Sequence, residues 1–349
     1  QARTLNIPAS EIQTFTLAPE GQRQQPPAAG TPVDARIPPT SQRTLANGLR
    51  VIVAPNRALP LISADFRVAS GSSADPANRA GVAGMTGDLL TRGTTTRGAT
   101  EIASQIESLG ASIGSGGGID SSAVSLQTRS DRSEEAFSIF ADVVRNPAFA
   151  NEELDRAKSE ALDGLQVALS QPGSIAGFAM TRAIYGTAPY GAIASPTSIG
   201  AITRDDMVNY HSTYWRPDNA VLVITGDVSA EEGFALAERH FGNWTRPSTA
   251  LPARPDVSAH AAPSRTIVVD LPDTGQAAVL MGLRGVARTD ADYFPLLVAN
   301  NVLGGGYSAR LNNEIRIRRG LSYGAGSSLS ARMGPGPIIA SAQTRNDAA

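Results

Sequence analysis

The same order of predicted elements occurs twice in this chain of 349 residues, and this repeat limits the possible folds most strongly. Residues 42–245 begin with the order strand, strand, helix, helix and strand, and residues 264–349 repeat that order. The proline-rich stretch 246–263 separates the two segments and is typical of an interdomain linker. The pattern therefore predicts two related domains, each built from both strands and helices.

Hydrophobic periodicity predicts the elements of the first segment. Residues 49–56 and 61–70 are expected to form neighbouring strands joined by a turn, followed by a helix that begins at Gly81. A flexible GSGGG stretch, 114–118, is expected before the next strand. The remaining predictions are helices at 98–110, 132–145, 151–169, 173–185, 202–214 and 229–241, and strands at 121–129 and 219–228.

The second segment is shorter than the first, with about 85 residues against about 200, and its last strands lack helices to cover them. We therefore expect the second domain to be truncated. Residues 1–41, rich in Pro, Gln, Ala and Thr, are predicted to form an extended N-terminal arm. In the second segment the pattern predicts strands at 265–271, 277–283, 323–332 and 337–343, and helices at 289–303 and 308–319.

Composition excludes several classes of function. A net charge of −2 and a pI near 6.0 do not favour binding to nucleic acid or to an anionic membrane. No apolar run approaches the roughly 20 residues that a membrane-spanning helix needs. The chain has no cysteine, which excludes disulfides, thiolate metal sites and a cysteine nucleophile. A start without methionine, followed by the arm, leads us to expect a periplasmic protein.

Histidine is scarce, which argues against an autonomous zinc site. The three histidines, His211, His240 and His260, are far apart in the sequence. None forms the i, i+4 pair of a helical zinc site, and a lone histidine is more often a packed or surface residue than a ligand.

The segment GVAGMTGDLLTRGT, residues 81–94, has the apolar residues of a buried helix but no obvious chemistry. Gly84 and Gly87 fall in the middle of the predicted helix, where each costs roughly 1 kcal/mol relative to alanine. Asp88 is the only acidic residue in the segment. Propensity alone does not explain these glycines.

The segment 301–328 is the most distinctive part of the second domain. A predicted helix ends at Gly320, and Tyr323, seven residues after Arg316, begins the next strand. A guanidinium suits a peptide carbonyl or carboxylate, and a phenol can donate a hydrogen bond to a developing oxyanion. On residue type alone, a solvated helix end and a half-buried tyrosine are the favoured explanation of the pair. The LGGG stretch, 303–306, lacks the Lys-Ser/Thr of a phosphate-binding loop.

Taken together, four stretches identify a family. RTLANGLRVIVAPN, GVAGMTGDLLTRGT, YWRPDNAVLVITGDV and LGGGYSARLNNEIRIRRGLSYG resemble the pitrilysin and insulinase zinc peptidases, which include the mitochondrial processing peptidases. The resemblance covers about residues 42–345. It implies an α+β fold of two related α/β domains, each an antiparallel sheet covered by helices, with the second domain incomplete here.

The resemblance also identifies the positions of a lost zinc site. Catalytic members of the family carry His-x-x-Glu-His where this chain has Gly84, Gly87 and Asp88 at the three defined positions. The third zinc ligand of the family, a glutamate, falls on Gly164. Because all four positions are substituted, we expect no metal and no cofactor in this chain.

The other half of the family's machinery is retained, since Arg316 and Tyr323 match its substrate-binding pair in type and spacing. The resemblance therefore implies a non-catalytic subunit of a heterodimeric zinc metalloendopeptidase that acts on peptides. A homologous partner subunit would hold the zinc. Two alternatives stay open: a purely structural subunit, like the core proteins of respiratory complexes, or a peptide-binding module that works without a zinc partner.

Overall fold

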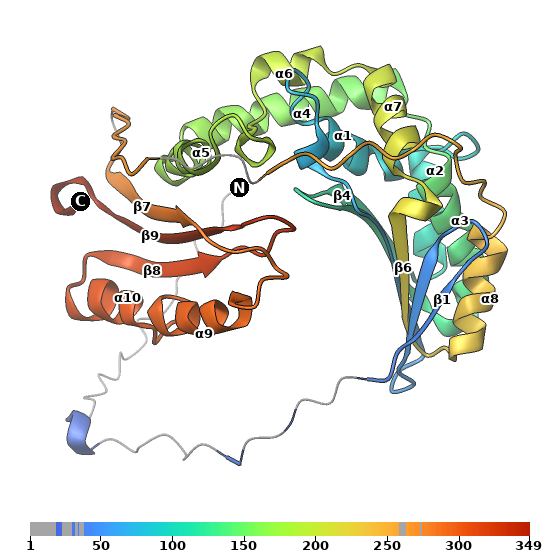
Figure 1. Cartoon of the computed structure of the whole chain (residues 1–349), viewed down its shortest axis with the longest axis horizontal. Helices are drawn as coiled ribbons and strands as arrows, with labels where there is room; N and C mark the ends of the chain where they lie inside the picture. The colour runs from blue at the N-terminus through green and yellow to red at the C-terminus, as the bar shows by residue number, and fades with distance from the viewer. Residues whose placement is uncertain (1–18, 23–29, 32–33, 35–37, 258–262, 273) are drawn as a thin grey trace, which may run out of the picture. The chain divides into compact units, whose positions relative to one another are not determined.

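The computed structural model describes residues 19–22, 30–31, 34, 38–257, 263–272 and 274–349 (Figure 1). The chain divides into two compact units, 1–37 and 38–349. In the first unit the described part includes one 3₁₀ turn, Glu20–Gln22, and most of the predicted arm lies outside the described residues. The description below concerns the second unit.

A six-stranded sheet forms the larger part of this unit, with the strand order β1-β2-β6-β3-β5-β4. The pair β2–β6 is parallel and the other pairs are antiparallel, so the expectation of a purely antiparallel sheet was wrong. β6 lies between β2 and β3, which are therefore not neighbours as predicted. The strands are β1 (Ser41–Thr44), β2 (Arg50–Pro55), β3 (Leu61–Val68), β4 (Ser112–Gly117), β5 (Ser122–Arg129) and β6 (Ala220–Gly226).

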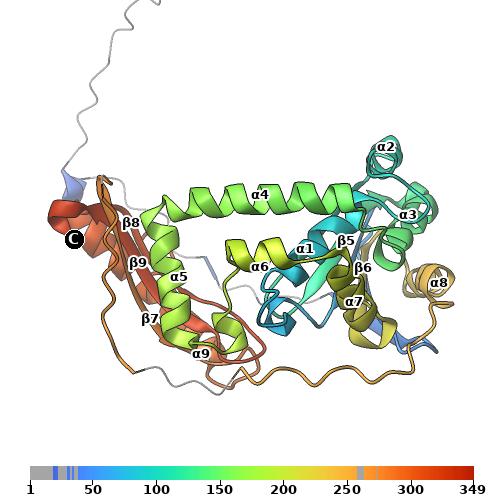
Figure 2. The ribbon, with the colours of Figure 1, turned by 90° about the horizontal axis from the view of Figure 1, so that it is seen from above.

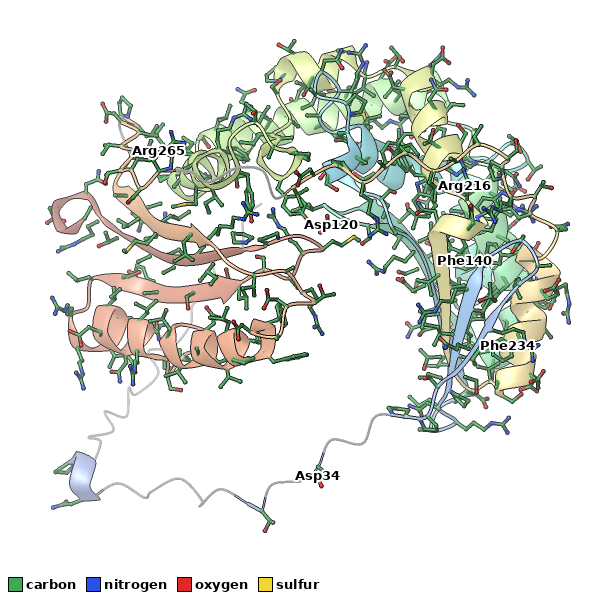
Figure 3. All side chains as sticks on the ribbon, in the orientation of Figure 1. Asp34, Asp120, Phe140, Arg216, Phe234 and Arg265 are labelled. Atoms are coloured by element: carbon green, nitrogen blue, oxygen red, sulfur yellow. The ribbon has the colours of Figure 1, made fainter. Side chains whose placement is uncertain are left out.

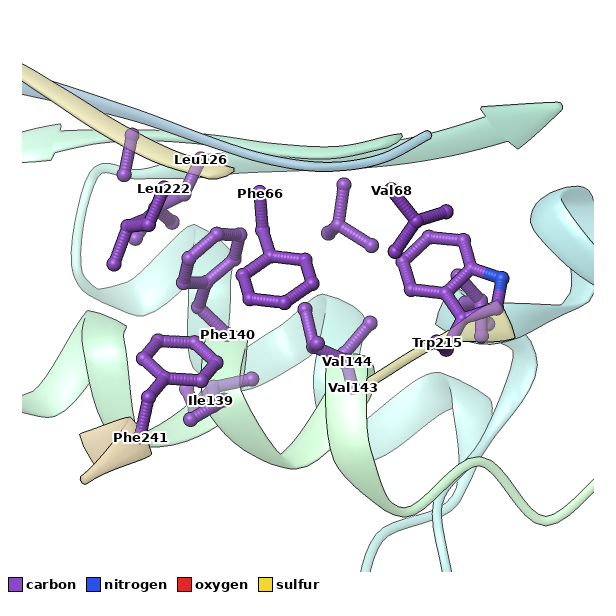
Figure 4. Close-up of a cluster of buried hydrophobic side chains, with 14 of the residues drawn as sticks. Phe66, Val68, Leu126, Ile139, Phe140, Val143, Val144, Trp215, Leu222 and Phe241 are labelled. Carbon is purple, nitrogen blue, oxygen red and sulfur yellow. The ribbon is translucent and has the colours of Figure 1, made fainter. Parts of the chain in front are cut away.

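Alternation along β3 decides which face of this sheet carries the core. Phe66 pairs in register with Val124 and Leu222, and all three side chains are fully buried. Helices cover this face, and the ring of Phe66 stacks on Phe241 at 5.2 Å between centroids (Figure 4). The opposite face mixes polar residues such as Ser63 and Asp65 with half-buried ones such as Val223, and it has no comparable core.

The described chain has eight α-helices before β7 (Gln276–Arg284), and seven match predicted helices. Helix α5 packs against β7 of the smaller sheet, since a Cβ on Gly282 would lie 2.5 Å from Sδ of Met180. The short helix α6 was not predicted; the Ser195 side chain caps its first turn in a capping box. Figure 2 shows the long helix α4 running between α1 and α5. The helices are α1 (Val82–Leu89), α2 (Ala99–Ser108), α3 (Ser133–Arg145), α4 (Asn151–Leu169), α5 (Pro172–Tyr185), α6 (Pro196–Ala201), α7 (Arg204–Tyr214) and α8 (Ala230–Phe241).

A smaller antiparallel sheet of three strands follows, in the order β7-β9-β8. It consists of β7 (Gln276–Arg284), β8 (Ser322–Leu329) and β9 (Pro337–Arg345). The predicted strand at 265–271 is wrong, because this apolar segment is exposed and pairs with no strand in the described chain. Without pairing, its apolar residues do not form a strand.

Two helical segments accompany the small sheet (Figure 1). They are α9 (Tyr293–Leu303) and α10 (Arg310–Asn312), and α10 continues as a π-helix over Asn313–Arg318. The helix predicted at 308–319 is thus irregular and ends, as expected, at the left-handed Gly320 with φ 63°. No helix in the described residues is long and apolar enough to cross a membrane.

Candidate functional site

Helix α1 contains three of the four positions where the family resemblance places zinc chemistry. Its first turn is capped by Asp75, whose carboxylate accepts hydrogen bonds from the backbone N–H groups of Gly81 (2.7 Å) and Ala83 (3.0 Å). Gly81 adopts φ 108°, a conformation that favours glycine. Burial raises the pKa of Asp75 to about 6, although the two backbone hydrogen bonds act in the opposite direction.

Packing against strand β4 explains the glycine at position 87. A Cβ atom there would lie 2.5 Å from the amide nitrogen of Gly117 and 2.6 Å from the carbonyl carbon of Gly116. The contact is reciprocal, since a Cβ on Gly117 would lie 2.6 Å from the carbonyl oxygen of Ala83. Backbone therefore touches backbone here, and any side chain at position 87 would force β4 away from α1.

Two of the other positions, Gly84 and Gly164, are open, and the third carries Asp88. A Cβ on Gly84 or on Gly164 of α4 would meet no described atom within 4 Å. Asp88 reaches solvent but lies beside β4, where a Cβ on Gly116 would be 3.6 Å from its Oδ1. Partial burial raises the pKa of the Asp88 carboxyl, and Arg92 opposes the shift. The four positions thus carry one carboxylate and no imidazole.

The histidines have structural surroundings. His211 is buried with Nε2 2.9 Å from the carbonyl oxygen of Val144, and burial lowers its pKa to about 4. His240 lies 3.1 Å from Glu134, whereas His260 falls outside the described residues. Over the described ranges, no three His, Cys, Asp or Glu side chains are placed to hold a metal ion. The donor set at α1 does not fit a zinc ion.

The predicted pair lies on the two sides of the corner that leads from the π-helix into β8. Arg316 belongs to the π-helical turn, with its guanidinium 5.0 Å from the ring centre of Tyr307. Tyr323, the second residue of strand β8, is 89% exposed. Among the described residues no hydrogen bond or ring contact links Arg316 to Tyr323; the Tyr323 side chain is exposed, whereas Arg316 is half-buried.

A groove of about 690 Å³ lies beside this pair. Asn312 secures its wall by donating to the carbonyl of Tyr307 (2.6 Å) and accepting from the amide of Ala325 (3.3 Å). A Cβ on Gly304 would lie 2.3 Å from the amide nitrogen of Ser327, so the LGGG stretch packs on β8. Most residues that line the groove are small and come from the three strands and this loop, including Ala278, Gly305, Gly306, Gly324, Gly326 and Ser341. The larger side chains of Leu280, Ile339 and Tyr307 also line it.

A second hollow of about 500 Å³ lies on the polar face of the six-stranded sheet. Asp65 accepts a hydrogen bond from the hydroxyl of Ser125 at 2.8 Å and pairs with Arg67 at 3.1 Å. Asp65 and Arg67 neutralise each other, so neither charge is left unpaired for a ligand.

Sequence reasoning missed three features of these surfaces. The GSGGG stretch forms most of strand β4, not a flexible loop, because Gly116 and Gly117 allow the close contact with α1. The cap from Asp75 was not predicted, although an acid upstream of an uncapped helix was a usable signal. Tyr307, beneath Arg316, lies nine residues away in the sequence and gave no local signal.

Comparison with known families identifies the fold. Residues 51–196 match the insulinase family model (peptidase family M16), and residues 201–349 match the model of the peptidase M16 inactive domain. A solved peptidase M16 inactive domain from Pseudomonas fluorescens is 31% identical, with a TM-score of 0.81 over 88% of this chain and 74% of that one. The chain belongs to the M16 peptidase family.

Other M16 relatives are more distant. An uncharacterized zinc protease of Mycobacterium leprae is 29% identical over 84% of this chain and 67% of its own length. A similar protein of Mycobacterium tuberculosis is 28% identical, and the chain spans 66% of its length. A protease structure from Helicobacter pylori shares the M16 fold, with 22% identity and a TM-score of 0.82 over 89% of this chain and 76% of that one.

Proposed function

We propose that this chain is the non-catalytic subunit of a heterodimeric zinc metallopeptidase, paired with a homologous M16 subunit that holds the zinc. The observation that carries the proposal is the contact between α1 and β4. Where the family's general base would stand, Gly87 lies against the backbone of Gly116 and Gly117, and a side chain there would displace the strand. The uncharged glycines at the two open positions, Gly84 and Gly164, add no ligand.

The contribution of this chain would come from Arg316 and Tyr323. The exposed phenol of Tyr323 can donate a hydrogen bond to the oxyanion that develops as a peptide bond is hydrolysed. The Arg316 guanidinium, supported on the Tyr307 ring, can hold a peptide carbonyl or carboxylate. Zinc and the activated water would belong to the partner.

Extended peptides are the substrate class that the surface suits best. Glycine, alanine and serine make up most of the lining of the groove next to the pair, so a backbone can approach the sheet closely at those residues. Each of the two alternatives makes a different prediction: a structural subunit needs neither Arg316 nor Tyr323, and a peptide-binding module needs no partner.

Purification from native cells tests the proposal. A tagged chain is isolated with its bound proteins, and the eluate is compared with the isolated chain for zinc and for cleavage of a quenched fluorescent peptide. We expect zinc and cleavage only with a copurifying M16 subunit. Cleavage by the isolated chain would refute the proposal. A copurifying subunit whose activity does not depend on Arg316 or Tyr323 would establish the structural alternative.

A further inference from the structure

The loop between β8 and β9, residues 330–336, is held by side chains that are distant in the sequence. The amide of Met333 donates to Oδ2 of Asp120 at 2.8 Å, and the amide of Gly334 donates to the hydroxyl of Tyr190 at 2.9 Å. The Tyr190 hydroxyl itself donates to the Asp120 carboxylate at 2.8 Å. Figure 3 labels Asp120, which lies in the β4–β5 connection at the approach of this loop. The Ser73 hydroxyl donates to the same carboxylate at 3.4 Å, so Asp120 accepts hydrogen bonds from three other segments.

Aromatic packing reinforces these hydrogen bonds. The guanidinium carbon of Arg332 lies 4.8 Å from the ring centre of Tyr190 and 5.1 Å from that of Tyr185. The hydroxyl of Tyr185 donates to the carbonyl of Pro335 at 2.9 Å. Both tyrosine rings are buried and meet edge to face at 5.5 Å. Four consecutive residues of the loop, 332–335, are therefore bound to groups of the first domain.

Backbone hydrogen bonds hold the segment that carries the Asp120 carboxylate. The amides of Ser72 and Ser73 donate to the carbonyls of Gly118 and Ile119, each at 2.9 Å, so the segment before Asp120 is tied to the 3₁₀ turn Ser72–Ala74. That turn comes directly before Asp75, the cap of α1. The loop of the small sheet is thus connected, through Asp120, to the element that orients α1.

The loop packs so closely at Gly334 that no side chain fits there. A Cβ on Gly334 would lie 2.3 Å from Cγ2 of Val257 and 3.3 Å from Cε2 of Tyr190. Glycine is therefore required for the amide at 334 to reach the tyrosine hydroxyl. The small sheet also packs on α5 through apolar groups, since a Cβ on Gly282 would lie 2.5 Å from Sδ of Met180. The hydrogen bonds of the loop are the polar part of this contact, and water can replace them when that part separates.

We propose that Asp120 and Tyr190 form a clasp that fixes the β8–β9 loop, and with it the three-stranded sheet, against the β4–β5 connection. The clasp is a conformational device. When it is closed, the small sheet and the first domain move as one body. When it opens, the packing of α5 on β7 still connects the two parts, and the strand that carries Tyr323 can change its position relative to α1 about that contact. The clasp involves no residue of the proposed catalytic pair, so it exists whether or not the chain works with a zinc-bearing subunit.

Spin labels on the full chain test the clasp, since the sequence has no cysteine to interfere. Glu107→Cys on α2 and Ala299→Cys on α9 introduce two exposed label sites. The distance between the two labels is then measured by electron–electron spectroscopy in the doubly labelled parent and in its Asp120→Asn and Tyr190→Phe variants. Asp131→Asn, at an exposed ion pair with Arg129, is the matched control. Circular dichroism confirms that each variant is folded.

We expect a narrow distance distribution for the parent and for Asp131→Asn, and a broader or displaced one for both clasp variants. Identical distributions in all four proteins would overturn the proposal. Hydrogen exchange on the unmodified chain gives a second test that needs no variant. The amides of Met333 and Gly334 should exchange about tenfold or more slowly than those of an unstructured peptide. Exchange at the unstructured rate would also overturn it.

Discussion

A Cβ atom on Gly87 would lie 2.5 Å from the amide nitrogen of Gly117, which brings the backbones of α1 and β4 into direct contact. The same helix has open space at Gly84. The two glycines of α1 therefore differ in their surroundings. Packing against β4 requires glycine at position 87 but not at position 84.

Alanine substitutions at the two positions distinguish a glycine required by packing from one that is not. Gly87→Ala should lower the free energy of unfolding by about 1–3 kcal/mol, because the methyl group overpacks the contact with β4. Gly84→Ala, the matched control, should raise it by up to about 1 kcal/mol through helix propensity. Urea denaturation of both variants measures the difference. Equal effects of the two substitutions would contradict the packing described for Gly87.

The Asp75 carboxyl should give stability a dependence on pH. Its pKa is raised from 3.8 to about 6 in the folded chain, so folding takes up a proton between these values. The stabilisation is complete below about pH 4 and is lost as the pH rises through 6, by up to about 3 kcal/mol. Asp75→Asn should remove this slope in denaturation curves measured from pH 4 to 7. An unchanged slope would exclude the shift.

His211 should act in the opposite direction. Burial lowers its pKa from 6.5 to about 4, so the unfolded chain binds a proton more readily than the folded chain between these values. The stabilisation is present above pH 6.5 and is lost as the pH falls towards 4, by roughly 3 kcal/mol. NMR titration of the His211 ring measures the pKa directly. A value near 6.5 would show that the ring is not buried as described.

Loss of one hydroxyl tests the proposed role of Tyr323 in the assembled peptidase. Tyr323→Phe should lower kcat by about 10²–10³, or about 2.7–4 kcal/mol, as expected for loss of an oxyanion-hole donor. Tyr293→Phe, at a buried tyrosine of α9, is the matched control and should leave kcat unchanged. A full-rate Tyr323→Phe enzyme would remove this residue from the mechanism.

Local patterns predicted the elements whose side chains alternate between core and solvent. Strand β5 is an example, because every second residue from Ser122 to Thr128 is buried or half-buried. Strand β4 was missed because its glycines conceal the alternation, and the exposed run Ile267–Val269 imitated a strand without a pairing partner. The insertion of β6 between β2 and β3 depends on pairing over more than 150 residues, which no local pattern encodes.

The candidate site was predicted to a similar extent. The identities of Gly84, Gly87, Asp88 and Gly164 came from the resemblance, but the reason for glycine at position 87 lies in β4, about 30 residues later in the chain. Likewise, the pair Arg316 and Tyr323 came from spacing, whereas the support of Arg316 by Tyr307 required the fold.

The absence of a working zinc site in this chain is tested most directly by its zinc content. The isolated chain is dialysed against zinc, and the bound zinc is measured by mass spectrometry. The measurement is made beside a peptidase assay on the same sample. Because glycine stands at three of the four zinc-site positions and a single carboxylate at the other, we expect no zinc above the buffer level and no cleavage. One zinc ion per chain together with peptide cleavage would contradict it.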